Sequence, residues 1–209
     1  KRGEHASNLG ALIAYDIAQL LPSADAFIAD PVVVDELQPL ARLSGHPLFE
    51  RRSIFHALNQ KAIARSHAKS IMKKYEDLDL IVVHLGGGIT VGAHQHGKVI
   101  DVNQGLDGDG PFSPERSGSL PVGQLLKVAY SGIYSYEKMS EMIVGKGGMM
   151  AYLGTNDAYI AQKEARNGDE KYLKVMEGMA YQVAKEIGAM STVLKGSVDG
   201  ILITGGIAN

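Results

Sequence analysis

Three consecutive glycines, Gly86 to Gly88, stand between two runs of apolar residues. Glycines at the turn of a hairpin leave backbone N–H groups bare, and such groups can bind phosphate oxygens. A second apolar run, beginning at Ile201, ends in Gly205 and Gly206. Two glycine turns of this kind predict a nucleotide that is held between the ends of strands.

The stretch Gly92–Lys98 matches the first seven positions of a P-loop but does not complete the motif. A P-loop requires Ser or Thr next, and Val99 stands there. The stretch also lies across a predicted hairpin, whereas a P-loop precedes a helix. His94 and His96 have the spacing of a two-ligand metal clip, but no third ligand is near, so a solvated turn is favoured.

Composition excludes several classes of protein. The 209 residues include 21 basic and 23 acidic side chains, a net charge of −2, which gives no footprint for nucleic acid or an anionic membrane. There is no cysteine, which excludes disulfides and favours a cytoplasmic location. No apolar run approaches the roughly 20 residues that a membrane span needs. The first residue is not Met and the last ones follow a glycine turn, so we expect a fold that is incomplete at both ends.

An amphipathic helix is predicted near the N-terminus. Its apolar positions are Leu9, Leu12, Ile13, Ile17 and Leu20. Ser7 or Asn8 would cap it, and Pro22 would end it. Residues 26–29 then predict a short strand that ends at Asp30, and the proline that follows would keep Asp30 extended.

The remaining elements predict an α/β fold. Ser53 is placed to cap a helix that reaches about Tyr75, with His56 in its first turn. A three-stranded meander follows at 80–85, 89–94 and 98–103, and then an irregular loop at 105–121. Three helices are predicted at 122–131, 136–144 and 169–195, and a closing strand begins at 201. Helices of this kind cover a mixed sheet.

Four ordered motifs give the chain a family resemblance. They are Glu4–Gly10, His84–Gly88, Ser113–Pro121 and Gly205–Asn209. The chain resembles the butyrate kinases of the acetate kinase family, within the actin/hexokinase/Hsp70 superfamily. The resemblance implies an actin-like, ribonuclease H-like ATPase fold, a mixed sheet flanked by helices. Residues 1–76 would end a first domain, and 77–209 would form a second, nucleotide-binding domain. The family's first phosphate hairpin, a substrate arginine and a magnesium-linked glutamate would lie outside this sequence.

The resemblance also implies an activity. Members transfer a phosphoryl group reversibly between ATP and a short-chain carboxylate, here butyrate, giving ADP and an acyl phosphate, with Mg²⁺ and as homo-oligomers. Acetate or propionate as acceptor is an alternative. So is a catalytically incomplete nucleotide-binding fragment, alone or completed by a separate chain. A carboxylate acceptor, with a pKa of roughly 4–5, is already ionised and needs no general base. The site must instead supply positive or hydrogen-bonding groups.

Arg116, His56 and Asp30 are the expected catalytic residues. The resemblance implies that Arg116 stabilises the transition state, since a guanidinium can bind two phosphoryl oxygens. It gives His56 contact with the transferring group at a helix N-terminus, which favours an anion. Asp30 would organise magnesium-bound water or orient Arg116. Taken alone, these residues also fit a surface arginine, a core histidine and a turn aspartate.

The expected nucleotide-binding residues lie at the two glycine turns and at one further turn. They are His84, Leu85, Gly86, Gly87, Gly88, Asp157, Gly205, Gly206, Ile207, Ala208 and Asn209. His84 fits a buried histidine equally well, and no direct metal ligand is assigned. Acetate kinases continue the His56 motif with Gly-Thr-Ser-His, whereas this chain has residues Ala57 to Gln60. We expect this departure to give a roomier, more apolar pocket.

Overall fold

A computed structural model describes residues 9–208, and its centre is one four-stranded mixed sheet. The strands are β1 (Leu80–Leu85), β2 (Ile89–Gln95), β3 (Lys98–Val102) and β4 (Gly200–Thr204), in the order β3-β2-β1-β4. The first three strands are antiparallel neighbours, which confirms the predicted meander. β4 runs parallel to β1, so the sheet is mixed, as predicted. The closing strand ends before its glycines.

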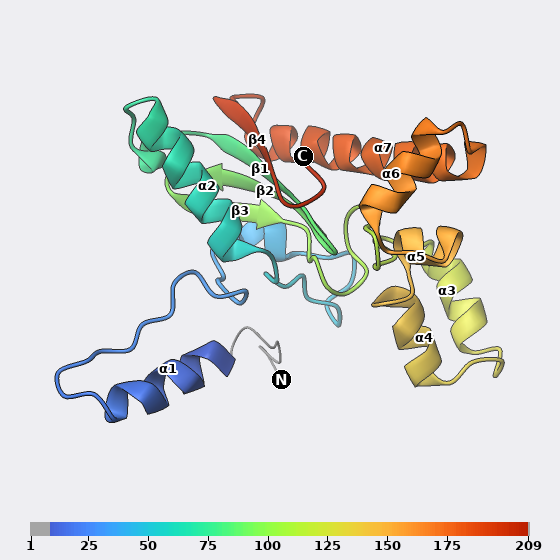
Figure 1. Ribbon diagram of the computed structural model, residues 1–209, viewed down its shortest axis with the longest axis horizontal. Helices are drawn as coiled ribbons and strands as arrows, with labels where there is room; N and C mark the ends of the chain where they lie inside the picture. The colour runs from blue at the N-terminus through green and yellow to red at the C-terminus, as the bar shows by residue number, and fades with distance from the viewer. Residues whose placement is uncertain (1–8, 209) are drawn as a thin grey trace.

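Helices cover both faces of the sheet (Figure 1). On β1, Ile81 and Val83 pack against the long helix α7 (Glu170–Val193), whereas Leu80 and Val82 pack on the side of α2 (Ala57–Ser70). Successive side chains of a strand point to opposite faces. The apolar run of β1 is therefore buried on both sides, as a central strand requires.

Helix α7 covers its face of the sheet with apolar residues at spacings of three and four. Met179, Val183 and Met190 are buried on this face, so these two methionines are part of the core. Asp169 caps the helix, since its carboxylate accepts hydrogen bonds from the N–H groups of Lys171 and Tyr172. Two helices missed by the sequence analysis, α5 (Gly148–Leu153) and α6 (Ala158–Arg166), pack against α7.

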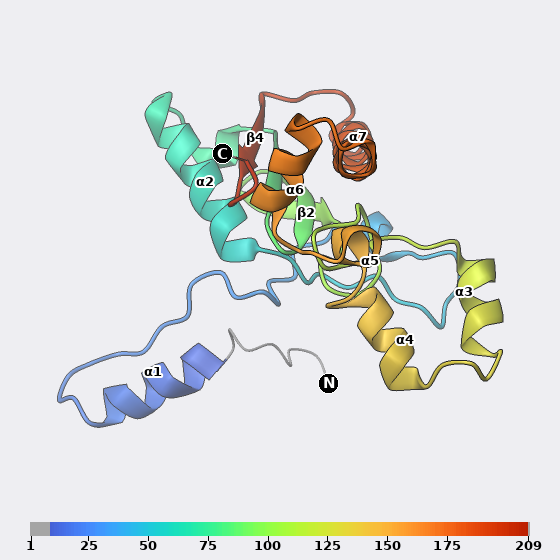
Figure 2. The same cartoon turned by 45° about the vertical axis from the view of Figure 1, so that its right-hand side comes forward.

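The remaining helices lie beside the sheet. The predicted helices α3 (Val122–Ala129) and α4 (Tyr136–Ile143) form a lobe with α5 (Figure 2). Two short 3-10 helices, Pro39–Arg42 and Tyr75–Asp77, complete the described elements. Among residues 9–208, no helix is long and apolar enough to cross a membrane.

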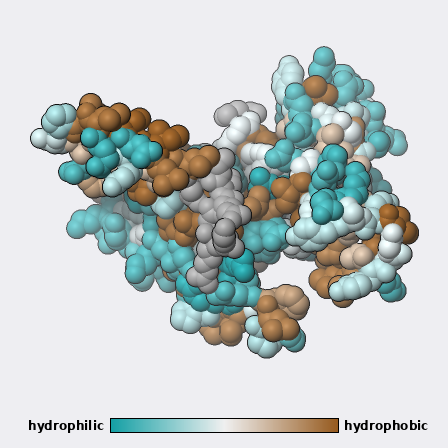
Figure 3. Space-filling model, turned by 90° about the horizontal axis from the view of Figure 1, so that it is seen from below, coloured by the Kyte–Doolittle hydropathy of each residue, from teal (hydrophilic) through white to brown (hydrophobic). Residues whose placement is uncertain are grey.

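Helix α1 (Leu9–Gln19) is confirmed but lies apart from the sheet (Figure 1). None of its residues is buried, and its predicted apolar positions are exposed. The surface over this helix is largely apolar (Figure 3). The predicted caps, Ser7 and Asn8, and the first five residues of the Glu4–Gly10 motif lie outside the described residues.

Four predictions for the first 75 residues were wrong. Residues 26–29 form no strand; they are exposed, and no described strand pairs with them. Asp30 has a φ of +42°, so its backbone is left-handed rather than extended. Helix α2 begins at Ala57, because the Ser53 hydroxyl donates to the Val34 carbonyl at 2.6 Å instead of capping a helix. It ends well before Tyr75, since Met72 turns the chain with a φ of +55°.

Candidate active site

The two glycine turns lie side by side at the carboxyl ends of β1 and β4. We call Gly86–Gly88 the first glycine turn and Gly205–Ile207 the second. They are neighbours because β1 and β4 are parallel, with His84 opposite Thr204. The Ile207 N–H donates to the Leu85 carbonyl at 3.1 Å, so the second turn folds back over the end of β1. Ligands of open α/β sheets bind at this edge, outside the carboxyl ends of the strands.

Gly205 is required by this close approach. Its φ is +100°, and a Cβ atom there would lie 2.2 Å from the Leu85 carbonyl oxygen. No L side chain fits both conditions. A Cβ atom on Gly206 would have no described atom within 4 Å, so packing among the described residues does not require glycine there.

The Ser113–Ser117 segment closes over the first glycine turn. The Ser113 hydroxyl donates to the Gly87 carbonyl at 2.6 Å. A Cβ atom on Gly87 would lie 3.4 Å from Glu115 Oε1, and one on Gly88 would lie 2.6 Å from Arg116 Nη1. The absence of side chains at the turn thus lets the guanidinium lie directly against the backbone.

One edge of the Arg116 guanidinium makes no hydrogen bond among the described residues. Nη1 donates to the Gly105 carbonyl. Nη2 lies 3.9 Å from Glu115 Oε1, and Nε is buried with no hydrogen-bond partner among the described residues. Burial lowers the pKa of Arg116, and the charge of Glu115 opposes this effect. An anion bound to the Nε–Nη2 edge would satisfy the buried donor and the charge together.

A second glycine stretch holds the Arg116 segment in place. The N–H groups of Met149 and Met150, in the first turn of α5, donate to the carbonyls of Ser113 and Pro114 at 3.0 and 2.8 Å. A Cβ atom on Gly148 would lie 1.9 Å from the Ser113 oxygen. The start of α5 can therefore approach this segment only because residue 148 is glycine. This close approach explains why a helix begins in a glycine-rich stretch.

Two histidines from different elements stack at the first turn. The rings of His56 and His84 are 3.8 Å apart between centroids and 13° from parallel. His56 Nδ1 lies 2.9 Å from Thr90 Oγ1, and His84 Nδ1 lies 2.8 Å from Asn59 Oδ1. A Cβ atom on Gly86 would lie 2.8 Å from His84 Nε2. Burial lowers the pKa of His84, which favours its neutral form.

The expectation that the departure at residues 57–60 gives a roomier, more apolar pocket stays a prediction. Asn59 bonds His84, and the buried Gln60 donates to the carbonyl and the hydroxyl of Thr90 at 3.1 and 2.8 Å. The start of α2 is thus a polar support for the two histidines. His94 differs from the prediction of a solvated turn, because it is fully buried, whereas His96 is exposed in the turn.

Asp30 faces α2 rather than Arg116. Its carboxylate lies 2.6 Å from Arg65 Nη1 and 3.9 Å from Lys61 Nζ. The Lys61 ammonium lies closer to Glu36, at 2.6 Å. The expected contact that would orient Arg116 is therefore not found among the described residues. The other expected role, the organisation of metal-bound water, stays a prediction.

Asp157 caps α6. Its carboxylate accepts hydrogen bonds from the N–H groups of Tyr159 and Ile160 at 2.9 and 3.1 Å. The preceding Asn156 donates to Glu115 Oε2 at 3.3 Å, so this turn lies beside the Arg116 segment. Contact with a nucleotide stays a prediction for Asp157, as it does for Ala208. Asn209 lies outside the described residues.

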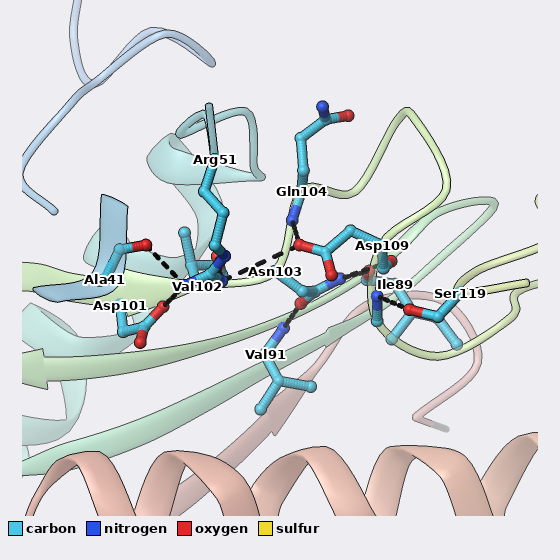
Figure 4. Close-up of polar contacts among 11 residues, drawn as sticks. Ala41, Arg51, Ile89, Val91, Asp101, Val102, Asn103, Gln104, Asp109 and Ser119 are labelled. Atoms are coloured by element: carbon cyan, nitrogen blue, oxygen red, sulfur yellow. Dashed lines mark hydrogen bonds and ion pairs between the residues drawn. The ribbon is translucent and has the colours of Figure 1, made fainter. Parts of the chain in front are cut away.

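A polar network fixes the loop that contacts Arg116 (Figure 4). Arg51 Nη1 donates to Asp101 Oδ1 at 3.0 Å and to the Ala41 carbonyl at 2.7 Å. Burial raises the pKa of Asp101, and the Arg51 charge opposes this shift. The Gln104 N–H donates to the Asp109 carboxylate at 2.9 Å. Arg51 Nη2 also lies 3.9 Å from Asp109 Oδ2, and this contact joins Arg51 to the loop that presents Gly105.

Asn103 continues the edge of β2 with its side chain (Figure 4). Its Oδ1 accepts from the Val91 N–H at 2.7 Å, and its Nδ2 donates to the Ile89 carbonyl at 3.1 Å. Asn103 is fully buried. It thus replaces the backbone of β3 at the point where the chain leaves the sheet.

A cavity of about 910 Å³ adjoins the Arg116 region. It lies between residues 32–54, the loop 104–107 and α4. Its apolar lining residues are Val32, Val33, Ile54, Leu106, Ile143 and Val144. Gln104 and Leu106 flank the Gly105 carbonyl that accepts from Arg116, and Val144 forms a β-bridge with Arg116. One wall of the cavity is therefore continuous with the backbone that holds the guanidinium.

Magnesium fits this site only with ligands supplied by a nucleotide. Residues 9–208 contain no group of three His, Cys, Asp or Glu side chains that would enclose a metal ion. Mg²⁺ is usually held by one or two carboxylates together with phosphates. Glu115 fits as one such carboxylate, since it is one-third exposed and lies beside Gly87. Asp30 does not fit as a direct ligand, because Arg65 and Lys61 already neutralise it.

Similarity to solved structures supports the predicted fold. The chain is similar to an acetate kinase from Porphyromonas gingivalis (TM-score 0.74, 23% identity), covering 82% of this chain and 45% of that one. It is similar to a propionate kinase from Francisella tularensis subsp. tularensis SCHU S4 (TM-score 0.73, 23% identity), covering 82% and 46%. It is also similar to an acetate kinase from Entamoeba histolytica (TM-score 0.70, 19% identity), covering 81% of this chain and 45% of that one.

The chain thus spans a little under half the length of these structures. Their likeness confirms the predicted actin-like ATPase fold, with its mixed sheet flanked by helices. The model of the Acetokinase family matches residues 41–209, which include both glycine turns, His56 and Arg116. This chain therefore belongs to the Acetokinase family.

Proposed function

We propose that this chain takes part in reversible phosphoryl transfer between ATP and a short-chain carboxylate, with butyrate as the preferred acceptor. The products are ADP and butyryl phosphate. The observation that supports this most is the position of Arg116, whose buried, unpartnered Nε lies in a guanidinium held against Gly88. A transferring phosphoryl group is stabilised by two donors that bind two of its oxygens, and the Nε–Nη2 edge would supply such a pair.

The chemistry requires little of the protein beyond position and charge. A carboxylate oxygen of the acceptor attacks the γ-phosphorus of ATP, the bond from this phosphorus to the bridging oxygen breaks, and ADP leaves with that electron pair. N–H groups of the first glycine turn would bind phosphate oxygens, and the Nε–Nη2 edge of Arg116 would stabilise the charge on the transferring group. His56 would donate a hydrogen bond to the same group from the N-terminus of α2.

The second glycine turn is proposed to bind the adenosine part of the nucleotide. It lies directly over the end of β1 and next to the first turn. His84 and Leu85 lead into the first turn. Asp157 follows Asn156, which donates a hydrogen bond to Glu115 in the segment that closes over this turn. Magnesium, with Glu115 as one ligand, would neutralise charge on the phosphates when bound.

The cavity beside Arg116 is proposed to take the acyl chain. Its volume of about 910 Å³ is in the range that holds ligands much larger than acetate. Its lining combines the apolar Leu106 and Val144, beside the Gly105 wall, with charged side chains that include Asp35, Arg51 and Glu141. Butyrate is favoured by the sequence motifs, whereas acetate or propionate as acceptor is favoured by the names of the solved structures that are similar.

Three further properties belong to the same proposal. Residues 77–209 would form the nucleotide-binding domain, and 1–76 would be the end portion of a preceding domain. The protein would act in the cytoplasm, consistent with a sequence that has no cysteine. It would assemble as a homo-oligomer.

Coupled measurement of ADP release tests the activity. The purified chain would be given magnesium, ATP and one acid at a time, from acetate to valerate. We expect turnover that is highest with butyrate. A maximum at acetate or propionate would contradict butyrate but keep the carboxylate kinase, and no acid-dependent release would contradict activity of this chain.

A nucleotide-binding unit without turnover is the second candidate. It is favoured by the length of the chain, which covers 45% of the acetate kinase from P. gingivalis. Isothermal titration with ADP distinguishes the two candidates: binding with no acid-dependent ADP release supports the unit, and acid-dependent release excludes it.

A further inference from the structure

A chain of buried polar side chains lies behind His56. We call Tyr75, His94, Gln60 and Thr90 the buried relay. Each is at most 5% exposed. Tyr75 OH lies 2.8 Å from His94 Nδ1, His94 Nε2 lies 3.0 Å from Gln60 Oε1, and Gln60 Nε2 lies 2.8 Å from Thr90 Oγ1. His56 Nδ1, at 2.9 Å from Thr90 Oγ1, continues the chain.

The Gln60 amide sets the direction of these hydrogen bonds. One end of the amide lies 3.1 Å from the Thr90 carbonyl oxygen, which can only accept. That end must therefore be the NH₂ group, and the oxygen must face His94. Because Gln60 Oε1 can only accept, His94 Nε2 must carry a hydrogen.

His94 and Tyr75 agree with this direction. Burial lowers the pKa of His94 to about 3, so the ring is neutral and Nδ1 carries no hydrogen. Nδ1 therefore accepts from the Tyr75 hydroxyl. Burial raises the pKa of Tyr75, which keeps that hydroxyl protonated. Every donor in this half of the relay thus meets an acceptor.

The direction extends to His56 through the Thr90 hydroxyl. Thr90 Oγ1 already accepts one hydrogen from Gln60, and its own hydrogen needs an acceptor because Thr90 is fully buried. Among residues 9–208, His56 Nδ1 is the acceptor found within hydrogen-bond distance of this hydroxyl, at 2.9 Å. If Thr90 donates to Nδ1, the hydrogen of a neutral His56 ring stands on Nε2.

The strand is built to admit the relay. Thr90, Gly92 and His94 alternate on β2 and therefore share one face of the sheet. A Cβ atom on Gly92 would lie 2.4 Å from Gln60 Oε1 and 3.2 Å from His94 Nε2. Glycine at the middle position thus leaves the space in which Gln60 reaches both neighbours.

We infer that the buried relay holds His56 in the neutral form with its hydrogen on Nε2, so that Nε2 is a fixed hydrogen-bond donor at the first glycine turn. Thr90 and Gln60 are then positioning residues for phosphoryl transfer, an inference that rests on the proposed function for what the donor serves. The stacked His84, whose Nε2 lies over Gly86, keeps the His56 ring at that turn.

Nitrogen NMR of the imidazole rings tests the inference directly. In the unmodified chain, labelled His56 should show a protonated Nε2 and an unprotonated Nδ1 shifted by an accepted hydrogen bond. Thr90→Val, which removes the hydroxyl at nearly constant volume, should move the Nδ1 signal to that of an unbonded nitrogen. Thr90→Ser should keep the original signal. A protonated Nδ1 in the unmodified chain, or an Nδ1 signal unchanged by Thr90→Val, would overturn the inference.

Tyr75→Phe is the matched control for damage to the relay. It removes one buried hydrogen bond but leaves the Thr90 hydroxyl in place, so the His56 signals should not move even if stability falls. Where acid-dependent ADP release is present, Thr90→Val should lower kcat on the order of tenfold, with little change in KM for ATP, and Thr90→Ser should keep the original kcat. Absence of ADP release from the unmodified chain counts against the proposed function, while the imidazole signals still decide the state of His56.

Discussion

His56 and His84 stack with their ring centroids 3.8 Å apart, although one residue begins a helix and the other lies near the end of a strand. Burial lowers the pKa of His84. We therefore predict that His84 titrates with a midpoint below the ordinary value of about 6.5. Ring proton shifts followed by NMR against pH measure this midpoint. A value at or above 6.5 would show that the ring is more solvated or closer to an anion than the structure indicates.

Replacement of Arg116 by Gln should lower turnover on the order of a hundredfold or more, with little loss of ATP affinity. The reason is that the Nε–Nη2 edge would act mainly on the charge of the transferring group. Steady-state kinetics and titration with ATP separate the two effects. Arg166→Gln, on the exposed end of α6, is the control and should change neither. Unchanged turnover in Arg116→Gln would remove this residue from the mechanism.

Gly205→Ala should destabilise the fold by about 2–4 kcal/mol, because its φ is +100° and the new Cβ would overlap the Leu85 carbonyl. Urea denaturation measures the loss. The adjacent Gly206→Ala is a matched control, since nothing lies within 4 Å of the Cβ position. Equal stability of the two variants would mean that the second glycine turn does not pack over β1 as described.

Asn103→Ala should cost about 2–4 kcal/mol, because the Val91 N–H and the Ile89 carbonyl would both lose a buried partner. Thermal and urea unfolding measure the cost. Asn156→Ala, at an exposed position with one hydrogen bond to Glu115, should change stability by less than about 0.5 kcal/mol. A small loss for Asn103→Ala would indicate that water replaces its amide at the edge of β2.

Local patterns predicted the sheet and the long helices well. The strands of the meander are short apolar runs bounded by glycines, and α7 repeats its apolar residues over many turns, so each can be recognised from neighbours in sequence. The strand expected at 26–29 failed because a strand also depends on a partner elsewhere in the chain. Helix α5 was missed because Gly147 and Gly148 serve a contact with the Arg116 segment, which no local pattern reveals.

The site was predicted as separate residues rather than as contacts. Glycines, an arginine in an irregular loop and a histidine before a helix are visible in the sequence, and motif resemblance selected them. That Arg116 lies against Gly88, and that Gln60 bonds Thr90, depends on pairs about 30 residues apart that only the fold brings together. His94 was misjudged for the same reason, since its partners are on α2 and the Tyr75 turn.

His94 should make stability depend on pH. Its pKa is lowered to about 3 in the fold, against about 6.5 in the unfolded chain. Above pH 6.5 both forms are neutral, so His94 has no effect there. As pH falls below 6.5, the unfolded chain binds a proton that the folded chain does not, so stability is lost at about 1.4 kcal/mol per pH unit until about pH 3.

Urea denaturation at pH 6.5 and pH 5.0 tests this effect. Between these values the unmodified chain should lose about 2 kcal/mol more than His94→Gln, which has no group to titrate at that position. His96→Asn is the control, because His96 lies exposed in the β2–β3 turn with a φ of +51° that Asn tolerates. Its pH dependence should equal that of the unmodified chain. Equal slopes for all three proteins would mean that His94 is solvated or protonated in the fold, and the buried relay would then lose its fixed direction at that residue.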